Sequence, residues 1–452
     1  MMKNDYILKG SIPKAILKLS APLIFGLVLQ TGYNIIDTIF VGRLGIEALA
    51  AISVTFPIVF FMIALASGIG LGTTSIISRN IGAKKLDEAK ITGFTSLILF
   101  MIITFMFSIF GVVFGKQIFS FMGIGKDILP LVLDYSKWIF GGSFFMFFGF
   151  VIESILRAEG NMKTPMYAMI ASTILNVILD PLLIFGIGPF PRLEIEGAAI
   201  ATIIARAIGT IGIAIYFFKG NNILNLKLEW LGFKLKYAKE ILYEGIPASF
   251  VRILMSTGQF FLTKIIASMG TVALAAFGIG FMRIDSFIFM PAFGVGMAIV
   301  TLVGQNVGAK KYDRAKISAI YGGALAAIIM VSIAFIIMVF KKQVVGWFTD
   351  DLEVARLCYD YISLVWPSFL FIGFSFVILS SFQGAGKPMI QLFLPITRFF
   401  IFIIPITYYF GVIKGFGISA LWKSILAANI AVGIVSIILF FIIGLKPKSL
   451  KD

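Results

Sequence analysis

An internal repeat constrains the fold of this chain more than any other feature of its sequence. The segment 79–90, which reads RNIGAKKLDEAK, returns as QNVGAKKYDRAK at 305–316, so the two copies lie 226 residues apart in a chain of 452. Shorter matches upstream have almost the same spacing, namely Ala48-Leu-Ala-Ala51 with Ala273-Leu-Ala-Ala276, and Gly68-x-Gly70 with Gly294-x-Gly296. Because the spacing is half the chain length, the repeat predicts one structural unit built twice.

Composition places both copies in a membrane. Hydrophobic residues make up 59% of the chain and charged residues only 13%, a balance that a soluble domain of this length would not have. A helix that crosses a bilayer needs roughly 20 mostly apolar residues. Such runs occur at approximately 16–42, 50–78, 91–114, 131–156, 165–187, 197–218, 245–268, 274–303, 317–340, 356–382, 388–412 and 417–444. The sequence therefore predicts an all-α membrane protein with twelve transmembrane helices.

The repeat divides the predicted helices into two lobes of six. Six is an even number, so both lobes enter the membrane from the same side, which predicts a parallel repeat about an axis along the membrane normal. We expect an N-terminal lobe at 1–218, a C-terminal lobe at 245–452, and between them a cytoplasmic linker at 219–244 that is partly an amphipathic surface helix. Such a duplication indicates a transporter, because two similar lobes can rock against each other around a shared path.

The positive charges predict how the chain is oriented. The net charge is +16, and basic residues concentrate in alternate loops, such as those that hold Lys84, Lys85, Lys310 and Lys311. By the positive-inside rule these loops are cytoplasmic, and both termini share their side. We therefore expect a multi-pass protein of the cell membrane with both termini in the cytoplasm, rather than a protein that binds nucleic acid.

The residue types that the sequence lacks exclude several chemistries. The chain has no histidine, and Cys358 is its only cysteine. An internal disulfide, a Cys or His metal centre and an imidazole proton relay are therefore excluded. No nucleophile and base constellation is visible, so we expect neither an enzyme nor a bound cofactor. Carboxylates remain as the groups best able to carry a proton or a small cation.

One acidic residue lies deep inside the first predicted span. Asp37 shares a helical face with Gln30, Tyr33 and Asn34, which makes a polar stripe in an otherwise apolar helix. A carboxylate at bilayer depth costs about 2.5–3.5 kcal/mol on the insertion scale, so one that stays there commonly has a function or a partner.

A second acid, Asp180, lies in the fifth predicted span. Thr173 and Asn176 share its face, and Pro181 directly after it frees a backbone carbonyl. Thr202 adds a hydroxyl in the sixth span, within a segment of small residues that permits close helix approach. The two carboxylates with amide, hydroxyl and carbonyl oxygens suit either sodium or a proton. The alternative is that the two acids only hydrogen-bond neighbouring helices together.

Other intramembrane charges have simpler interpretations. Glu153 and Arg157 are spaced i, i+4 near the cytoplasmic end of the fourth span, which predicts a structural ion pair. Asp285 is the strongest second-lobe candidate for a functional acid.

The chain resembles the multidrug and toxic compound extrusion (MATE) family over essentially all of its length. The resemblance implies twelve helices in two six-helix lobes around a central cavity, and export of cationic or amphipathic compounds in exchange for sodium or protons. It rests on Pro22, on Tyr33 to Asp37 followed by Val41-Gly-Arg43, on Gly82-Ala-Lys-Lys85 repeated as Gly308-Ala-Lys-Lys311, on Arg157-Ala-Glu-Gly160 answered by Gln383-Gly-Ala-Gly386, on Asn176 to Asp180-Pro181, and on Gly197 to Thr202.

Within that family the sequence is most similar to the prokaryotic DinF-like branch, whose cation site lies in the N-terminal lobe. The resemblance implies that helix 1 bends at Pro22. We also expect a monomer, whose partners are its substrate, its coupling ion and the lipid bilayer. The repeat supports a first-lobe site, because Asp37 corresponds to Leu262, and Asp180-Pro181 to about Ile404-Pro405. The implied cation site comprises Asp37, Asn176, Asp180 and Thr202, and the implied substrate cavity Gln30, Tyr33, Asn34 and Thr173.

Two other kinds of transporter have a similar helical duplication. A flippase for lipid-linked oligosaccharides or undecaprenyl lipids should have a cationic cavity for pyrophosphate, whereas the central polar cluster predicted here is acidic. A major-facilitator transporter should have a Gly-x-x-x-Asp-Arg-x-Gly-Arg-Arg loop after the second span, where this chain has the repeated segment 79–90 instead.

Overall fold

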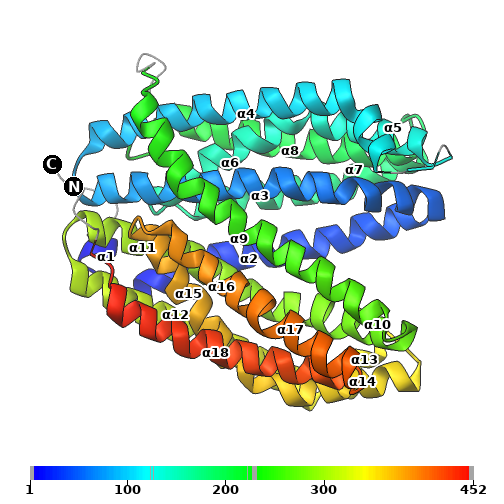
Figure 1. The fold of residues 1–452 in the computed structure, drawn as a ribbon. Helices are drawn as coiled ribbons and strands as arrows, with labels where there is room; N and C mark the ends of the chain where they lie inside the picture. Colours follow the sequence, from blue (N-terminus) through cyan, green and yellow to red (C-terminus); the bar gives the residue numbers. More distant parts are fainter. Residues whose placement is uncertain (1–4, 123, 126, 221, 227–231, 447–452) are drawn as a thin grey trace. The chain divides into compact units, whose positions relative to one another are not determined.

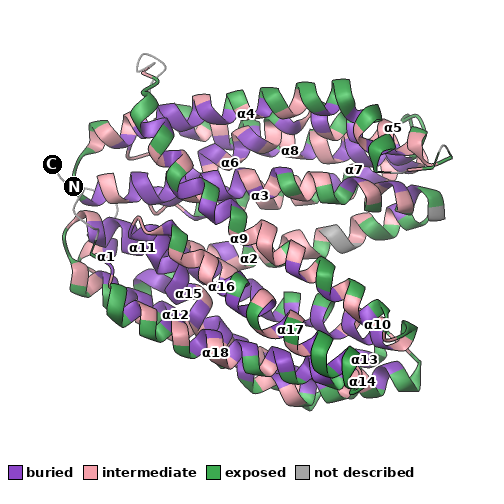
Figure 2. Ribbon diagram, in the orientation of Figure 1, coloured by how far each residue is buried: buried purple, intermediate pink, exposed green. Residues whose placement is uncertain are grey.

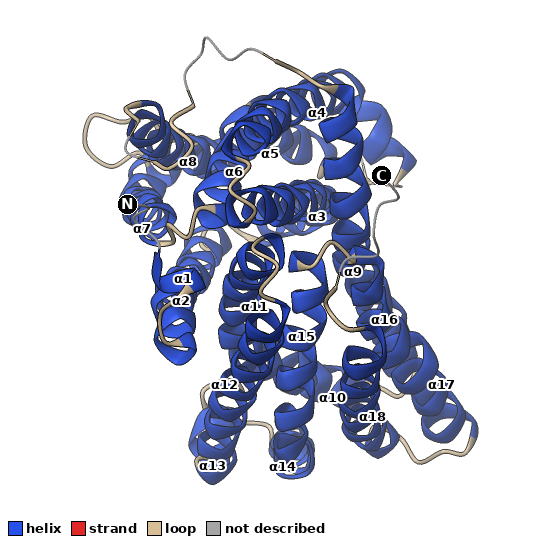
Figure 3. Ribbon diagram, turned by 90° about the vertical axis from the view of Figure 1, so that its left-hand side faces the viewer, coloured by secondary structure: helices blue, strands red, loops and turns tan. Residues whose placement is uncertain are grey.

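The fold is built from helices alone in the part of the chain that is described (Figure 1; Figure 3). A computed structural model describes residues 5–122, 124–125, 127–220, 222–226 and 232–446. The side chains of Asp5, Asn34, Ile35 and Ile46 lie outside the description, as does the part of the predicted linker at 221 and 227–231.

The first half of the chain forms long helices joined by short turns. The fourth predicted span is a bent pair, α5 and α6, which meet at an angle of 41°. The elements are α1 Asp5–Leu8, α2 Ile12–Gly42, α3 Ile46–Gly82, α4 Leu86–Phe121, α5 Leu129–Gly141, α6 Ser143–Ala158, α7 Lys163–Phe185 and α8 Glu194–Phe218.

The second half is more often interrupted by π-helical and 3-10 turns, which are written η. π-helical segments precede Asp285 and surround Arg398, and such segments commonly occur at functional sites. The elements are α9 Leu235–Ala267, α10 Thr271–Phe277, η2 Gly278–Ile284, α11 Asp285–Gly308, α12 Tyr312–Val339, α13 Lys341–Gly346, α14 Leu352–Val365, η3 Trp366–Ser368, α15 Phe369–Gly384, η4 Pro388–Leu392, α16 Phe393–Pro395, η5 Ile396–Ile403, α17 Ile404–Ile406, η6 Thr407–Ile413 and α18 Ser419–Ile443.

The predicted all-α membrane architecture is confirmed. Among the described residues, 11 helices are long and apolar enough to cross a membrane, or 12 when the bent pair α5 and α6 is one span. The chain is therefore a multi-pass membrane protein. Residues 235–244, at the end of the predicted linker, do not form a separate surface helix. They are the first turns of α9, which continues without a break into the seventh span.

Two compact units share the chain, and two helices belong to both. The first unit contains Phe25–Ile246, and the second contains Asp5–Ile24 together with the chain from Pro247 onward. α2 changes unit just after Pro22 and α9 at Pro247, two prolines that lie 225 residues apart in equivalent places of the repeat. The lobe boundaries at 218 and 245 stay a prediction.

The repeated sequence folds into the same backbone in both units. Lys84 and Lys310 have left-handed φ angles of 62° and 57°. The next amide closes the turn in each copy: the Lys85 N–H donates to Asn80 O at 2.9 Å, and the Lys311 N–H donates to Asn306 O at 2.8 Å. Equal turns at both helix ends confirm that the repeat is structural.

Packing is densest around α11 in the second unit. In the span that α11 shares with α10, 83% of the most apolar window is buried, against 17–56% in the other long spans. Figure 2 shows α11 as a nearly continuous buried helix. Asp285, the first residue of α11, is thereby held away from solvent and lipid.

Candidate cation site in the first unit

The predicted polar residues of α2, α7 and α8 meet within the first unit. Asn176 Nδ2 donates to Asp180 Oδ1 at 3.2 Å and to Thr202 Oγ1 at 3.4 Å. The Tyr33 hydroxyl lies 3.5 Å from the same Thr202 hydroxyl. Four side chains from three helices are therefore linked by hydrogen bonds, and the role of these residues in binding a cation stays a prediction.

The two acids of the cluster interact and leave oxygens unpartnered. The Asp37 and Asp180 carboxyl groups contact each other, and Asp180 is fully buried. Buried atoms without a hydrogen-bond partner include Asp37 Oδ1, Asn176 Oδ1 and Asp180 Oδ2. Most buried polar atoms in proteins are hydrogen-bonded, so three acceptor oxygens together without donors point to a ligand that supplies positive charge.

The local sequence explains how these oxygens come together. Pro181 lacks an N–H group, so the carbonyl of Val177 loses its helical donor beside the two acids. A side chain at Gly197 would meet the backbone of α7, because an added Cβ would lie 2.5 Å from Leu183 O. Glycine at this position therefore permits the close approach of α7 and α8 that brings Thr202 to Asn176.

The remaining predicted residues occupy more peripheral places. Gln30 on α2 and Thr173 on α7 are half-buried, and no recorded hydrogen bond among the described side chains joins either to the cluster. The side chain of Asn34 lies outside the described residues. α2 runs continuously through Pro22, so a bend there stays a prediction.

Sequence reasoning missed two residues of this site. Tyr135 on α5 lies within electrostatic reach of Asp37 and Asp180, and Arg206 on α8 within reach of Tyr33 and Tyr135. A signal for each was present, because Arg206 follows Thr202 by one helical turn. Tyr135 returns as Tyr361 at the repeat spacing of 226.

The predicted ion pair between Glu153 and Arg157 is confirmed. Arg157 Nη1 lies 3.1 Å from Glu153 Oε2, and Arg157 Nη2 donates to Ser154 Oγ at 3.1 Å. Both partners lie on α6, so this pair braces one helix, as an i, i+4 spacing predicts.

The chemistry of the site suits a monovalent cation. Among the described residues there is no group of three or more His, Cys, Asp or Glu side chains that could hold a metal. Two carboxylates with neutral amide and hydroxyl oxygens form a hard-oxygen set that can bind a small cation, or a proton when the carboxyls are desolvated. Either a proton shared by the carboxyls or a sodium ion among the oxygens would satisfy the unpartnered atoms.

Known proteins similar to this chain share its whole length. The sequence matches the MatE family over residues 22–182 and 247–409. It is 28% identical over 438 residues to a FAD transporter of Shewanella oneidensis, covering 96% of this chain and 95% of the relative. It is 27% identical over 456 residues to the multidrug export protein MepA of Staphylococcus saprophyticus, covering 98% and 97%.

A solved structure agrees with this assignment. The outward-facing conformation of a multidrug resistance MATE family transporter of the MOP superfamily superposes with a TM-score of 0.91 at 29% identity, covering 97% of each chain. The two matched segments begin at Pro22 and Pro247, at or just before the points where α2 and α9 change unit. Sequence and fold together show that this chain is a member of the MatE family of membrane transporters.

Proposed function

We propose that this transporter is a secondary active exporter that moves cationic or amphipathic compounds outward in exchange for sodium or protons. The observation that carries the proposal is the set of three unpartnered buried oxygens on Asp37, Asn176 and Asp180. Relatives named as multidrug export proteins support the substrate class.

Exchange requires that the ion binds two conformations unequally. An ion at Asp37 and Asp180 neutralises charge that is costly at bilayer depth, so it stabilises the conformation in which these oxygens are closest. A positive elementary charge that moves inward across the membrane gains about 2.3 kcal/mol of free energy per 100 mV of membrane potential. In this proposal ion binding bends α2 at Pro22 and contracts a cavity lined by Gln30, Tyr33, Asn34 and Thr173.

The protein would act as a monomer in the cell membrane with both termini in the cytoplasm. The N-terminal lobe at 1–218 carries the ion site in this proposal, and the linker at 219–244 joins it to the C-terminal lobe at 245–452. The DinF-like branch fits this arrangement because Leu262, the repeat counterpart of Asp37, is apolar and fully buried.

The test is export of a fluorescent cationic dye from proteoliposomes in which sodium and pH gradients are imposed separately. The wild-type protein should export dye with one of the two gradients. The variant Asp37→Asn/Asp180→Asn should reduce gradient-driven export to the level of empty vesicles. Neither amide side chain carries the negative charge that binds and releases the coupling cation.

Asp134→Asn is the matched control. Asp134 is an acid of the same unit, but it is partly exposed on α5 and pairs with Lys137 at 3.0 Å. The control variant should export dye like the wild type. Normal gradient-driven export by a correctly inserted Asp37→Asn/Asp180→Asn protein would refute the site assignment.

A second candidate function is export of a flavin dinucleotide. One relative is named a FAD transporter, and Arg206 places a guanidinium within electrostatic reach of Tyr33 and Tyr135 in this unit. Such a cation favours an anionic group beside an aromatic one. Transport of FAD in the same vesicles, lost in Arg206→Gln while dye export is kept, would support this candidate.

A further inference from the structure

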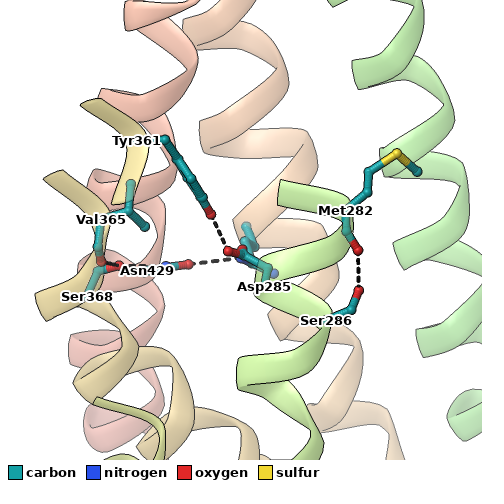
Figure 4. Close-up of polar contacts among 8 residues, drawn as sticks. Met282, Asp285, Ser286, Tyr361, Val365, Ser368 and Asn429 are labelled. Atoms are coloured by element: carbon teal, nitrogen blue, oxygen red, sulfur yellow. Dashed lines mark hydrogen bonds and ion pairs between the residues drawn. The ribbon is translucent and has the colours of Figure 1, made fainter. Parts of the chain in front are cut away.

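The second unit contains its own buried polar network, which the proposed exchange does not use. The Tyr361 hydroxyl donates to Asp285 Oδ1, and Asn429 Nδ2 donates to Ser368 Oγ at 2.8 Å. Figure 4 shows Tyr361, Asp285, Asn429 and Ser368 gathered from separate helices. Asp285 is 4% exposed and Tyr361 1%. An intramembrane acid buried to this degree requires a partner.

The partner is Arg398 on η5. Arg398 Nη2 lies 3.9 Å from Asp285 Oδ2, and Arg398 Nε donates to Asn429 Oδ1 at 3.0 Å. The guanidinium carbon also lies 5.3–5.6 Å from three aromatic rings, those of Phe281, Phe289 and Phe399. With 3% of its surface exposed, Arg398 is buried within this unit, and its Nη2 faces Asp285 Oδ2 as an ion pair in which neither atom makes a hydrogen bond. Its charge is therefore available to Asp285 and not to a substrate.

This network occupies the place in the repeat that the candidate cation site occupies in the first unit. Tyr361 corresponds to Tyr135 at a spacing of 226. Aligning Gly197 with Gly417 places Trp422 opposite Thr202, and the Trp422 ring lies 4.5 Å from that of Tyr361. Arg398 lies on the helix that corresponds to α7, seven residues before Pro405, the counterpart of Pro181. Three of the four helices that contribute to this network are thus the repeat counterparts of helices at the candidate cation site.

The fourth helix differs, and so does the sign of the charges. The acid of the second unit comes from α11, at a position whose first-unit counterpart is Phe60, whereas Leu262 takes the place of Asp37. In the first unit two acids face each other, and among the described side chains the groups in contact with them are acidic or neutral. In the second, one acid faces one arginine.

We propose that Arg398 is a resident cation, which occupies in the second unit the role that a transported ion has in the first. The guanidinium neutralises Asp285 permanently, so the second unit binds no exchangeable ion. Arg398 thereby determines how many coupling ions the transporter carries. Removing its charge exposes a cation site at Asp285, with Tyr361 and Asn429 as neutral ligands. This inference rests on the proposed ion exchange in the first unit.

The test counts cations bound to purified protein in lipid nanodiscs. Sodium binding is measured with radioactive Na⁺ and proton binding by potentiometric titration of the same samples. Arg398→Gln should bind one more cation, as Na⁺ or H⁺, than the wild type. Arg398→Lys retains the charge and should bind the wild-type number. Asp285→Asn/Arg398→Gln removes both charges and should also bind the wild-type number, with dye export still driven by the same gradient.

Three results have distinct meanings. If Arg398→Gln binds no additional cation, or if Asp285→Asn/Arg398→Gln loses one, the resident-cation proposal is wrong. Asp285→Asn/Arg398→Gln leaves no unpaired buried charge, so its cation count tests the proposal even where Arg398→Gln does not fold. If the wild type itself binds neither sodium nor an exchangeable proton, the exchange function fails instead. Arg252→Gln, which changes a half-buried arginine over the Phe293 ring, is the matched control for loss of an intramembrane arginine.

Discussion

The two units solve the same electrostatic problem in opposite ways. The first unit buries Asp180 completely beside Asp37 and leaves an oxygen of each without a donor. The second unit also buries Asp285, and Asp285 Oδ2 likewise accepts no hydrogen bond, but this unit provides a tyrosine hydroxyl at Oδ1 and a guanidinium 3.9 Å from Oδ2. A scaffold that is duplicated in its turns is therefore not duplicated in its charges.

The difference supports the proposal that the repeated fold has a single ion site. Burying a charge is expensive unless a partner compensates it. A partner that is part of the chain gives stability without exchange, whereas a partner from solution gives exchange at the cost of stability. Loss of one buried acid should therefore have opposite effects on stability in the two units.

The largest effect is expected for Asp285→Asn. This change leaves the Arg398 guanidinium buried without its counter-charge, and breaking a buried pair in this way commonly destabilises a protein by about 3–5 kcal/mol. We expect a much lower apparent melting temperature in nanodiscs. Asp285→Asn/Arg398→Gln should recover most of the loss, and a double variant as unstable as the single one would show that Arg398 is held by other contacts.

A smaller effect, of opposite sign, is expected for Asp37→Leu. This change installs the residue that the repeat places at Leu262 and removes a buried oxygen without a partner. An unsatisfied buried group costs about 1–3 kcal/mol, so the variant should melt at a higher temperature than the wild type. Gradient-driven dye export should fall to background, the trade of function for stability that sites of this kind show.

Lower stability of Asp37→Leu would contradict the comparison, because it would mean that the first-unit acids are internally compensated. Ile178→Leu, on an exposed face of α7, controls for the introduction of a leucine in this unit.

Glu159 extends the comparison to the C-terminal end of α6, with an effect expected only within a defined pH window. Its carboxylate accepts the N–H groups of Ile223 at 3.1 Å and Leu224 at 3.0 Å, and its repeat counterpart is Ala385. Burial raises the pKa of Glu159 from 4.5 to about 7, although the two N–H donors oppose the shift.

Between these two values the folded chain keeps a proton that the unfolded chain has released, so stability should fall as the pH rises from about 4.5 to about 7. Glu159→Gln keeps an acceptor oxygen and should flatten this slope. Melting temperatures of both proteins across that window measure the difference, and parallel curves would show that Glu159 does not titrate there.

The sequence predicted the helices closely because apolar length and the repeat are local or linear signals. The predicted span at 356–382 lies within the helical stretch Leu352–Gly384, and the span at 388–412 closely matches Pro388–Ile413. The π-helical segments were not predicted, because they depend on how neighbouring helices fit together. Nothing in the sequence near 278–284 or 396–403 distinguishes one extra residue per turn from an ordinary helix.

The candidate site was predictable where it consisted of polar residues on one helical face. Asp37 with Tyr33, and Asp180 with Asn176, could be found in this way. The partner of Asp285 could not, because Arg398 is 113 residues distant in the sequence and among apolar neighbours. A long-range charge pair leaves no periodic signal, so only the folded chain shows that Arg398 lies beside Asp285.

The repeated turn at Lys84 and Lys310 bears on how the chain is inserted during synthesis. Both lysines adopt a left-handed backbone conformation that costs about 1–2 kcal/mol for a residue with a side chain and nothing for glycine. Each turn thus retains a lysine where glycine would be more stable. A positive charge at the tip of a short loop resists translocation across the bilayer. The turn therefore favours keeping its own end of each half untranslocated before either half has folded, and the backbone strain is the cost of that early topological instruction.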